Sequence, residues 1–462
     1  MAQRIGKFTF TLFFVLCSMA AVRLFAGPEE DIIQLYGQDA VFTTVPDSVF
    51  VQLGWDLPDG GASVKAIADA APGGAFDPRK LETLGSDKLG YQAKWHEVRY
   101  KVYGLDWEIG GLHLAPNQPV AGLPTLVIIH GGSANWYEFF VDQFNSPGIS
   151  QYLAQKIPVL LLTIPGNYKH GGWAETSYVD RIPAYLLSKE ISAEEAKVRN
   201  SVYTFRVVVE GVRQIIEKAT AGPIVVWGHS TGGEIPYLLM DTPLKARMSG
   251  GYLGWGSGGP AMLDVELSSP EAHARGDRER FSQYAPVKTL RARSAGEYAF
   301  DSAYIGPLNP CKGADKLEVA ECWFRQEERR RPQFKQKLQD MEHSGASELR
   351  EQVAVEIRAA LRENNFGVNP EEVLADLFST TRVPMTGFKK MLYLIGKLDG
   401  HASMRDGIPS EARVANAFRK RNPQTPIRVA LFDTPMTHYG YIERPKPLAA
   451  AMLAGLKWLA AP

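Results

Sequence analysis

The residue that could most directly do chemistry is Ser230, in the stretch P-I-V-V-W-G-H-S-T-G-G-E-I-P-Y-L-L-M. A β-branched run, Ile224 to Trp227, precedes it, and an apolar segment suited to a helix follows Gly232. We therefore expect Ser230 at a strand-to-helix turn, where Gly228 and Gly232 are needed because side chains there would collide. A serine held on such a strained turn can serve as a nucleophile.

The G-x-S-x-G pattern alone is a weak signal, and a serine in a Gly-rich turn is the alternative. A second Gly-rich segment, H-G-G-S-A-N-W from His130 to Trp136, follows the apolar run Thr125 to Ile129. Together the two motifs resemble those of the α/β-hydrolase superfamily. The resemblance implies that an oxyanion is bound by the backbone N–H of Thr231 and by that of Gly132 or Ser133.

The same resemblance implies that an acid and then a histidine follow the nucleophile along the chain. Asp399 comes just after the apolar run Lys390 to Ile395, and Asp406 is its main competitor for the role of acid. His438 lies in the loop after the last predicted strand, where the family keeps its general base, and His401 is the alternative base. The expected triad is Ser230, Asp399 and His438, and it needs neither a metal nor a cofactor.

Three loop aromatics are candidates for lining a substrate pocket: Trp136, Tyr168 and Trp173. Tyr168 and Trp173 belong to a loop that follows a predicted strand, and open α/β sheets bind ligands at the carboxyl ends of their strands. Aromatic residues that only cover the core are an equally good interpretation. We assign no catalytic role to His170 in this loop.

Alternating strand and helix patterns predict an α/β protein with a mostly parallel central sheet and flanking helices, and the resemblance implies that this is the α/β-hydrolase fold. The stretch from 260 to 384 departs from the sheet pattern, so we expect an inserted, largely helical cap there. The predicted strands include an antiparallel pair with a turn at Gly104 to Asp106, and an amphipathic helix is expected at the C-terminus. The expected divisions are a signal peptide (1–26), an irregular N-terminal extension (27–94), a first part of the core (95–259), the cap (260–384) and a second part of the core (385–462).

Finer expectations follow from hydrophobic periodicity. We expect strands at Trp95 to Tyr103, Trp107 to Leu114, Thr125 to Ile129, Ile157 to Ile164, Ile224 to Trp227, Gly250 to Trp255, Lys390 to Ile395 and Ile427 to Phe432. Helical patterns cover Ser150 to Lys156, Ala193 to Ala219, Phe334 to Met341, Ala346 to Glu363, Pro370 to Phe378 and Pro447 to Leu459.

Composition narrows the class of protein. The chain has 462 residues, of which 45% are apolar and 22% charged, and its formal net charge is zero. This composition predicts a globular protein that can bury one large core or two smaller ones. The balanced charge argues against a nucleic-acid partner.

The N-terminus has the pattern of an export signal. Arg4 and Lys7 precede the apolar run Phe8 to Val22, and small residues up to Ala26 predict cleavage near that position, with a retained anchor as the alternative. We therefore expect a secreted or periplasmic protein. In such a compartment Cys311 and Cys322 are expected to form a disulfide, and two free thiols are the alternative.

These features predict an exported serine hydrolase that cleaves a carboxylic ester, either small or polymeric, through an acyl-enzyme. Cleavage of an amide, lactone or thioester, or acyl transfer, on the same triad is the nearest alternative, because a fold does not fix a function. A non-catalytic binding protein on this scaffold is a more remote one. The substrate and the oligomeric state stay open.

Overall fold

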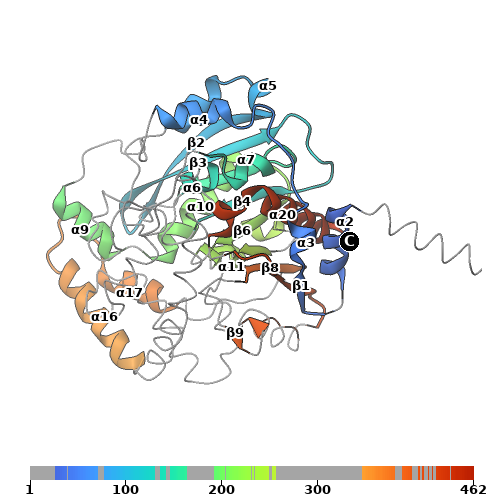
Figure 1. Ribbon diagram of the computed structural model, residues 1–462. Helices are drawn as coiled ribbons and strands as arrows, with labels where there is room; N and C mark the ends of the chain where they lie inside the picture. The colour runs from blue at the N-terminus through green and yellow to red at the C-terminus, as the bar shows by residue number, and fades with distance from the viewer. Residues whose placement is uncertain are drawn as a thin grey trace, which may run out of the picture.

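The computed structural model describes most of the chain outside the first 26 residues and the large segment 256–345 (Figure 1). The described residues are 27–38, 40–70, 77–130, 136–141, 146–163, 192–202, 204–229, 232–233, 235–248, 252–255, 346–379, 388–397, 404–405, 408–409, 415, 419, 423–436 and 439–462.

A nine-stranded sheet runs through the centre of the described part (Figure 1). Its spatial order is β1-β11-β8-β7-β6-β4-β5-β3-β2. All neighbours from β1 to β5 are parallel, whereas β3 runs antiparallel to both β5 and β2. The predicted α/β-hydrolase fold with a mostly parallel sheet is therefore confirmed. The strands are β1 (Phe42–Val45), β2 (Tyr91–Val102), β3 (Leu105–Pro116), β4 (Thr125–Ile129), β5 (Val159–Thr163), β6 (Ile224–His229), β7 (Tyr252–Trp255), β8 (Met391–Gly396) and β11 (Ile427–Phe432).

The central strands are largely apolar because helices cover both of their faces. Every residue of β4, β5, β6, β8 and β11 is buried. Strands β4 and β11 have the predicted bounds, and the other predicted strands differ from the observed ones by a few residues at their ends. A separate short ribbon pairs β9 (Met404–Arg405) with β10 (Ile408–Pro409).

The N-terminal extension is regular rather than irregular, so that prediction was wrong. Its residues Phe42–Val45 form β1, which pairs with β11 at one edge of the sheet. The elements are short and separated by Pro and Gly residues, which hides their periodicity in the sequence. Besides β1 they are α2 (Pro28–Gly37), α3 (Asp47–Phe50), α4 (Ala62–Asp69), η1 (Pro78–Thr83) and α5 (Ser86–Leu89).

The C-terminal helix α20 (Pro445–Ala460) was predicted to be amphipathic, but it is buried on nearly every side. All residues from Leu448 to Leu456 are buried. Helices α2 and α7 (Ile149–Leu153) pack against it, and the Tyr36 hydroxyl donates a hydrogen bond to the Ala451 carbonyl at 3.4 Å. A helix that is apolar all round must be covered on all sides, and the N-terminal extension supplies the outer cover.

At the opposite edge of the sheet, β2 and β3 form a hairpin with a two-residue turn at Tyr103 and Gly104. The predicted turn at Gly104 to Asp106 therefore begins one residue and ends two residues too late. Both turn residues have positive φ angles, 53° for Tyr103 and 76° for Gly104. A turn of this kind matches the twist of the two strands. The Tyr103 hydroxyl also donates a 2.8 Å hydrogen bond to Asp376 in the insertion.

The helical pattern from Ala193 to Ala219 is two helices, α9 (Ala193–Ser201) and α10 (Phe205–Ala219), and α10 packs on β2 and β3. Two helices predicted in the inserted segment are present, α16 (Ala346–Leu361) and α17 (Pro370–Ser379), and they pack on α9 and α10. The pattern at Phe334 to Met341 lies outside the described residues. The remaining short elements are α6 (Trp136–Phe140), α11 (Ile235–Leu239), η4 (Pro243–Ala246) and α19 (Gly440–Glu443).

Candidate active site

The described residues around Ser230 have the close backbone packing that a nucleophile elbow requires. Strand β6 ends at His229, and Gly232 and Gly233 form a helical turn before α11. A Cβ atom added to Gly228 would lie 2.4 Å from the Gly233 Cα atom and 2.5 Å from the Gly232 carbonyl oxygen. The inference that no side chain fits at Gly228 is therefore confirmed. Ser230 and Thr231 themselves lie outside the described residues.

The end of β4 lies directly against this turn. A Cβ atom added to Gly232 would lie 2.5 Å from the His130 carbonyl oxygen and 2.8 Å from that of Ile129. The segment that was predicted to supply an oxyanion donor, with Gly132 and Ser133, begins immediately after His130. Both residues fall outside the described part of the chain. The contact nevertheless joins the two Gly-rich motifs that the sequence singled out.

A third close approach joins the strands that precede the predicted acid and base. Strand β8 ends at Gly396, and a Cβ atom added there would lie 2.4 Å from the Met436 carbonyl oxygen. Asp399 follows Gly396 by three residues in the sequence, and His438 follows Met436 by two. Asp399 and His438 are themselves outside the described residues, as are the alternatives Asp406 and His401.

A buried aromatic cluster, formed by Phe139, His229 and Tyr441, connects three of these segments. The Phe139 and Tyr441 rings are stacked, with centroids 4.1 Å apart and planes within 7°. The His229 ring meets the Tyr441 ring edge-on at 4.9 Å and lies 5.7 Å from the Phe139 ring. His229 directly precedes Ser230, and Tyr441 follows His438 by three residues. Because all three rings are fully buried, the cluster fixes the spacing between these segments.

Two acidic residues that the structure describes in this region, Glu138 and Glu443, are buried. Glu138 in α6 is only 3% exposed, and its carboxylate accepts a 3.5 Å hydrogen bond from the Tyr441 hydroxyl. Glu443 at the end of α19 is also buried. A buried carboxylate needs hydrogen-bond donors to offset the loss of its hydration, and Tyr441 supplies one to Glu138. Tyr441 therefore connects the aromatic cluster to α6 by both stacking and hydrogen bonding.

Of the three predicted pocket aromatics, the structure describes Trp136. Its side chain is 3% exposed, and its ring centroid lies 5.9 Å from Trp95 and 6.4 Å from Phe140. These contacts place it in the aromatic core at the start of α6. Tyr168 and Trp173 lie outside the described residues, so substrate contact by any of the three stays a prediction.

The sequence analysis missed the aromatic cluster and the contact between Gly396 and Met436. Each aromatic residue lies beside a motif that was singled out, but ring contacts between distant segments have no sequence pattern of their own. The one usable signal was the closing glycine of β8. A glycine that ends a buried strand often marks a close approach of another backbone.

Within the described part of the chain, no group of three or more His, Cys, Asp or Glu residues could hold a metal ion. The same residues contain no helix long and apolar enough to cross a membrane. The expected signal peptide, Cys311 and Cys322 lie outside the described residues.

Comparison with known proteins gives likenesses of structure alone. No family model and no curated protein sequence matches the chain. A protein of Acinetobacter baumannii described as a lipase is 17% identical, with 80% of this chain and 92% of that chain covered and a TM-score of 0.36. A bacterial membrane phospholipase A is 15% identical, with 98% and 99% covered and a TM-score of 0.36. An epoxide hydrolase of Vigna radiata is 11% identical, with 79% and 98% covered and a TM-score of 0.36.

The sheet order and the tight turn after β6 define the fold of this chain as an α/β-hydrolase fold. The described residues that flank Ser230, the His130 segment and His438 lie together in this fold. The activities named for the similar structures are properties of those proteins.

Proposed function

We propose that the protein is a serine hydrolase that cleaves a carboxylic ester. The observation that carries this proposal is the convergence of the described neighbours of the predicted catalytic residues. Gly232 lies against the end of β4, Gly396 lies against Met436, and the rings of His229 and Tyr441 are in contact. A triad needs its nucleophile, base and acid within hydrogen-bond reach, and the flanking contacts are consistent with that.

In the proposed mechanism His438 takes the proton of Ser230 as the hydroxyl attacks the ester carbonyl. The alcohol leaves with a proton from His438, and water then releases the acid from the acyl-enzyme in the same way. Asp399 holds the imidazole in the correct tautomer and stabilises the imidazolium. The N–H groups of Thr231 and of Gly132 or Ser133 stabilise the oxyanion, each by about 3 kcal/mol.

A fluorophosphonate probe tests the nucleophile without knowledge of the substrate. We expect the probe to label the folded protein once, and peptide mapping by mass spectrometry to locate the label on Ser230. Heat-denatured protein is the control, because labelling depends on an activated serine. An unlabelled native protein, or a label on another residue, would contradict the proposal.

The identity of the acid is tested by comparing two substitutions. Asp399→Asn is expected to lower kcat by about 10⁴-fold, because an amide favours the wrong histidine tautomer. Asp406→Asn is the matched control and is expected to change kcat little. The reverse pattern would assign the acid to Asp406.

The ester preference is tested with p-nitrophenyl esters of increasing acyl length, set beside panels of amides, lactones and thioesters. We expect esters to give a higher kcat/KM than amides, because a phenolate or alkoxide is a better leaving group than the anion of an amine. Faster turnover of an amide or a lactone would contradict the ester preference but would leave the proposed triad unchanged.

Export and the disulfide are further parts of the proposal. The chain is expected to lose its first 26 residues on export, and Cys311 is expected to be joined to Cys322. Analysis of the mature N-terminus and peptide mapping without reduction test both points. A retained N-terminus or two free thiols would contradict the corresponding part.

A further inference from the structure

The strand β1 joins the sheet beside the strand that leads to the predicted base. Residues Phe42–Val45 pair in parallel with Val429–Phe432, as Figure 1 shows by the blue β1 next to the red C-terminal elements. The hydrogen bonds extend beyond the strand, since the Asp433 N–H donates to the Val45 carbonyl at 2.9 Å. The N-terminal extension thus contacts the first residue of the loop that continues to His438.

The next residue of this loop is held by a side-chain contact. The Thr434 hydroxyl donates a hydrogen bond of 2.5 Å to the Asp47 carboxylate at the start of α3. Thr434 is 1% exposed, whereas Asp47 lies at the surface. A buried hydroxyl requires a partner, and a charged acceptor makes the stronger kind of hydrogen bond. Below this contact the Phe50 and Phe432 rings pack with centroids 4.8 Å apart.

The loop is fixed again two residues further on. The Met436 carbonyl lies against Gly396, where no side chain would fit. Lys397, just after that glycine, pairs with Asp433 at 2.7 Å. The segment Asp433–Met436 is therefore held on one side by the N-terminal extension and on the other by the end of β8, and His438 follows two residues later.

We propose that Asp47 and Thr434 are positioning residues for the predicted general base, an inference that rests on the proposed function. Neither is assigned contact with the substrate, and Asp47 acts only through Thr434. A base must lie within hydrogen-bond reach of the nucleophile, and a displacement of about 1 Å can cost about 10²-fold in rate. The N-terminal extension thereby contributes directly to the geometry of the site.

The test compares substitutions that remove or retain the hydroxyl. Thr434→Val keeps the buried volume but removes the donor, and we expect kcat on a p-nitrophenyl ester to fall about 10- to 100-fold with KM nearly unchanged. Thr434→Ser retains the donor and is expected to restore kcat to within about threefold of the parent. Asp47→Ala should match Thr434→Val, and the double variant should lose no more than either single one, because both remove the same bond.

A matched control distinguishes an effect on the position of the general base from a general destabilisation of the N-terminal extension. Asp56 is an exposed aspartate of the same extension, paired with Lys446 of α20 at 2.6 Å. Asp56→Ala is expected to leave kcat unchanged. The rate of fluorophosphonate labelling should follow kcat in all variants, and the acidic limb of the kcat/KM pH profile should move in Thr434→Val and in Asp47→Ala only.

Failure of this inference can be told from failure of the proposed function. Parent-like kcat and pH profile in Asp47→Ala and Thr434→Val, with Ser230 still labelled by the probe, would overturn the positioning role alone. Equal losses in Asp56→Ala, or no recovery in Thr434→Ser, would also overturn it. If Thr434→Val does not fold, Asp47→Ala alone tests the positioning role. The Asp47 side chain is exposed, so its removal leaves no cavity.

Discussion

The two edges of the sheet avoid unwanted strand pairing in different ways. At one edge β1 has only four residues, its inward side chains are buried, and the Phe50 and Phe432 rings close the space beneath it. At the other edge β2 has twelve residues and carries ion pairs along its length, such as Arg99 with Glu108 at 2.9 Å. Short strands and charged strands both prevent edge-to-edge association.

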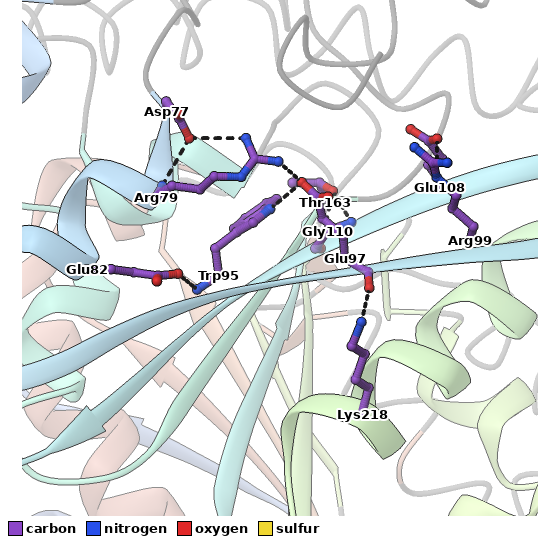
Figure 2. A network of polar contacts seen from close by, with 10 residues as sticks. All are labelled: Asp77, Arg79, Glu82, Trp95, Glu97, Arg99, Glu108, Gly110, Thr163 and Lys218. Carbon is purple, nitrogen blue, oxygen red and sulfur yellow. Dashed lines mark hydrogen bonds and ion pairs between the residues drawn. The ribbon is translucent and has the colours of Figure 1, made fainter. Parts of the chain in front are cut away.

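Figure 2 shows the polar network of the hairpin edge. Glu97 accepts hydrogen bonds from the Trp95 indole at 2.8 Å and from Arg79, and its backbone carbonyl accepts one from Lys218. The Trp95 ring in turn covers Gly110, where a Cβ atom would clash with it at 2.1 Å. Most of these charges are exposed, so each contributes little to stability.

The comparison of the two edges indicates that stability and catalysis depend on the same contacts at the β1 edge but not at the hairpin edge. The β1 edge is anchored by a few buried contacts next to the loop of the predicted base. The hairpin edge has many exposed contacts, and they lie at the opposite side of the sheet from that loop. We therefore expect substitutions at the β1 edge to have large effects on folding and catalysis, and those at the hairpin edge to have small, condition-dependent effects.

The largest expected effect on stability is that of Phe50→Ala at the β1 edge. Phe50 is fully buried, so truncation leaves a cavity and should cost about 3 to 5 kcal/mol of unfolding free energy. The neighbouring Val51 is 59% exposed, and Val51→Ala is the control, with an expected change below about 0.5 kcal/mol. Urea unfolding measures both. Similar midpoints for the two variants would contradict the packing of α3 against Phe432 at this edge.

An intermediate effect is expected from His113 at the hairpin edge. Burial lowers the pKa of His113 to about 4, helped by the charges of His96 and Lys94. Burial also lowers the pKa of His96. The positive charges of Lys94 and Lys218 lower this pKa further, whereas the negative charge of Glu82 raises it. Because the folded-state pKa of His113 is below its ordinary value, folding stability should be lost as the pH falls from about 6.5 through about 4.

Protonation of His113 should lower the unfolding free energy by at most about 3 kcal/mol. The actual loss should be smaller, because solvent screens a partly buried ring. His113→Gln stays neutral over this range, so its unfolding free energy should depend less on pH than that of the parent. Urea unfolding at pH 7 and pH 4.5 measures the difference. An equal pH dependence in parent and variant would assign the titration to other groups.

The smallest effect is expected from Arg99→Gln. The Arg99 side chain is 70% exposed, so its ion pair with Glu108 should contribute less than about 1 kcal/mol. We expect the effect to shrink further in 0.5 M salt, because salt screens exposed charges. A loss above about 2 kcal/mol would show that the hairpin edge is anchored like the β1 edge.

The buried strands were predictable, because strands covered on both faces are continuous apolar runs. Strand β11 matched its prediction at both ends, and β4 matched as well. Strand β1 was not predictable from F-T-T-V, since four residues give too short an alternation and the pairing partner lies at the other end of the chain. A second contact between distant parts of the chain, the packing of α2 on α20, explains why α20 is buried rather than amphipathic.

For the candidate site, local steric reasoning succeeded and contacts between distant segments were missed. The need for glycine at positions 228 and 232 follows from a strand and a helix that meet at a sharp turn. The stacking of Phe139 on Tyr441 and the bond from Thr434 to Asp47 join segments that are far apart in the sequence. Such contacts form only in the completed fold, and no local sequence pattern predicts them.

The most direct test of the account is the turnover of Ser230→Ala, measured together with its thermal unfolding. The substitution removes the proposed nucleophile, and we expect kcat on the best ester to fall by about a million-fold with a nearly unchanged melting temperature. Ester turnover within about tenfold of the parent, in a variant that still unfolds at the parent temperature, would contradict the assignment of Ser230 as the nucleophile.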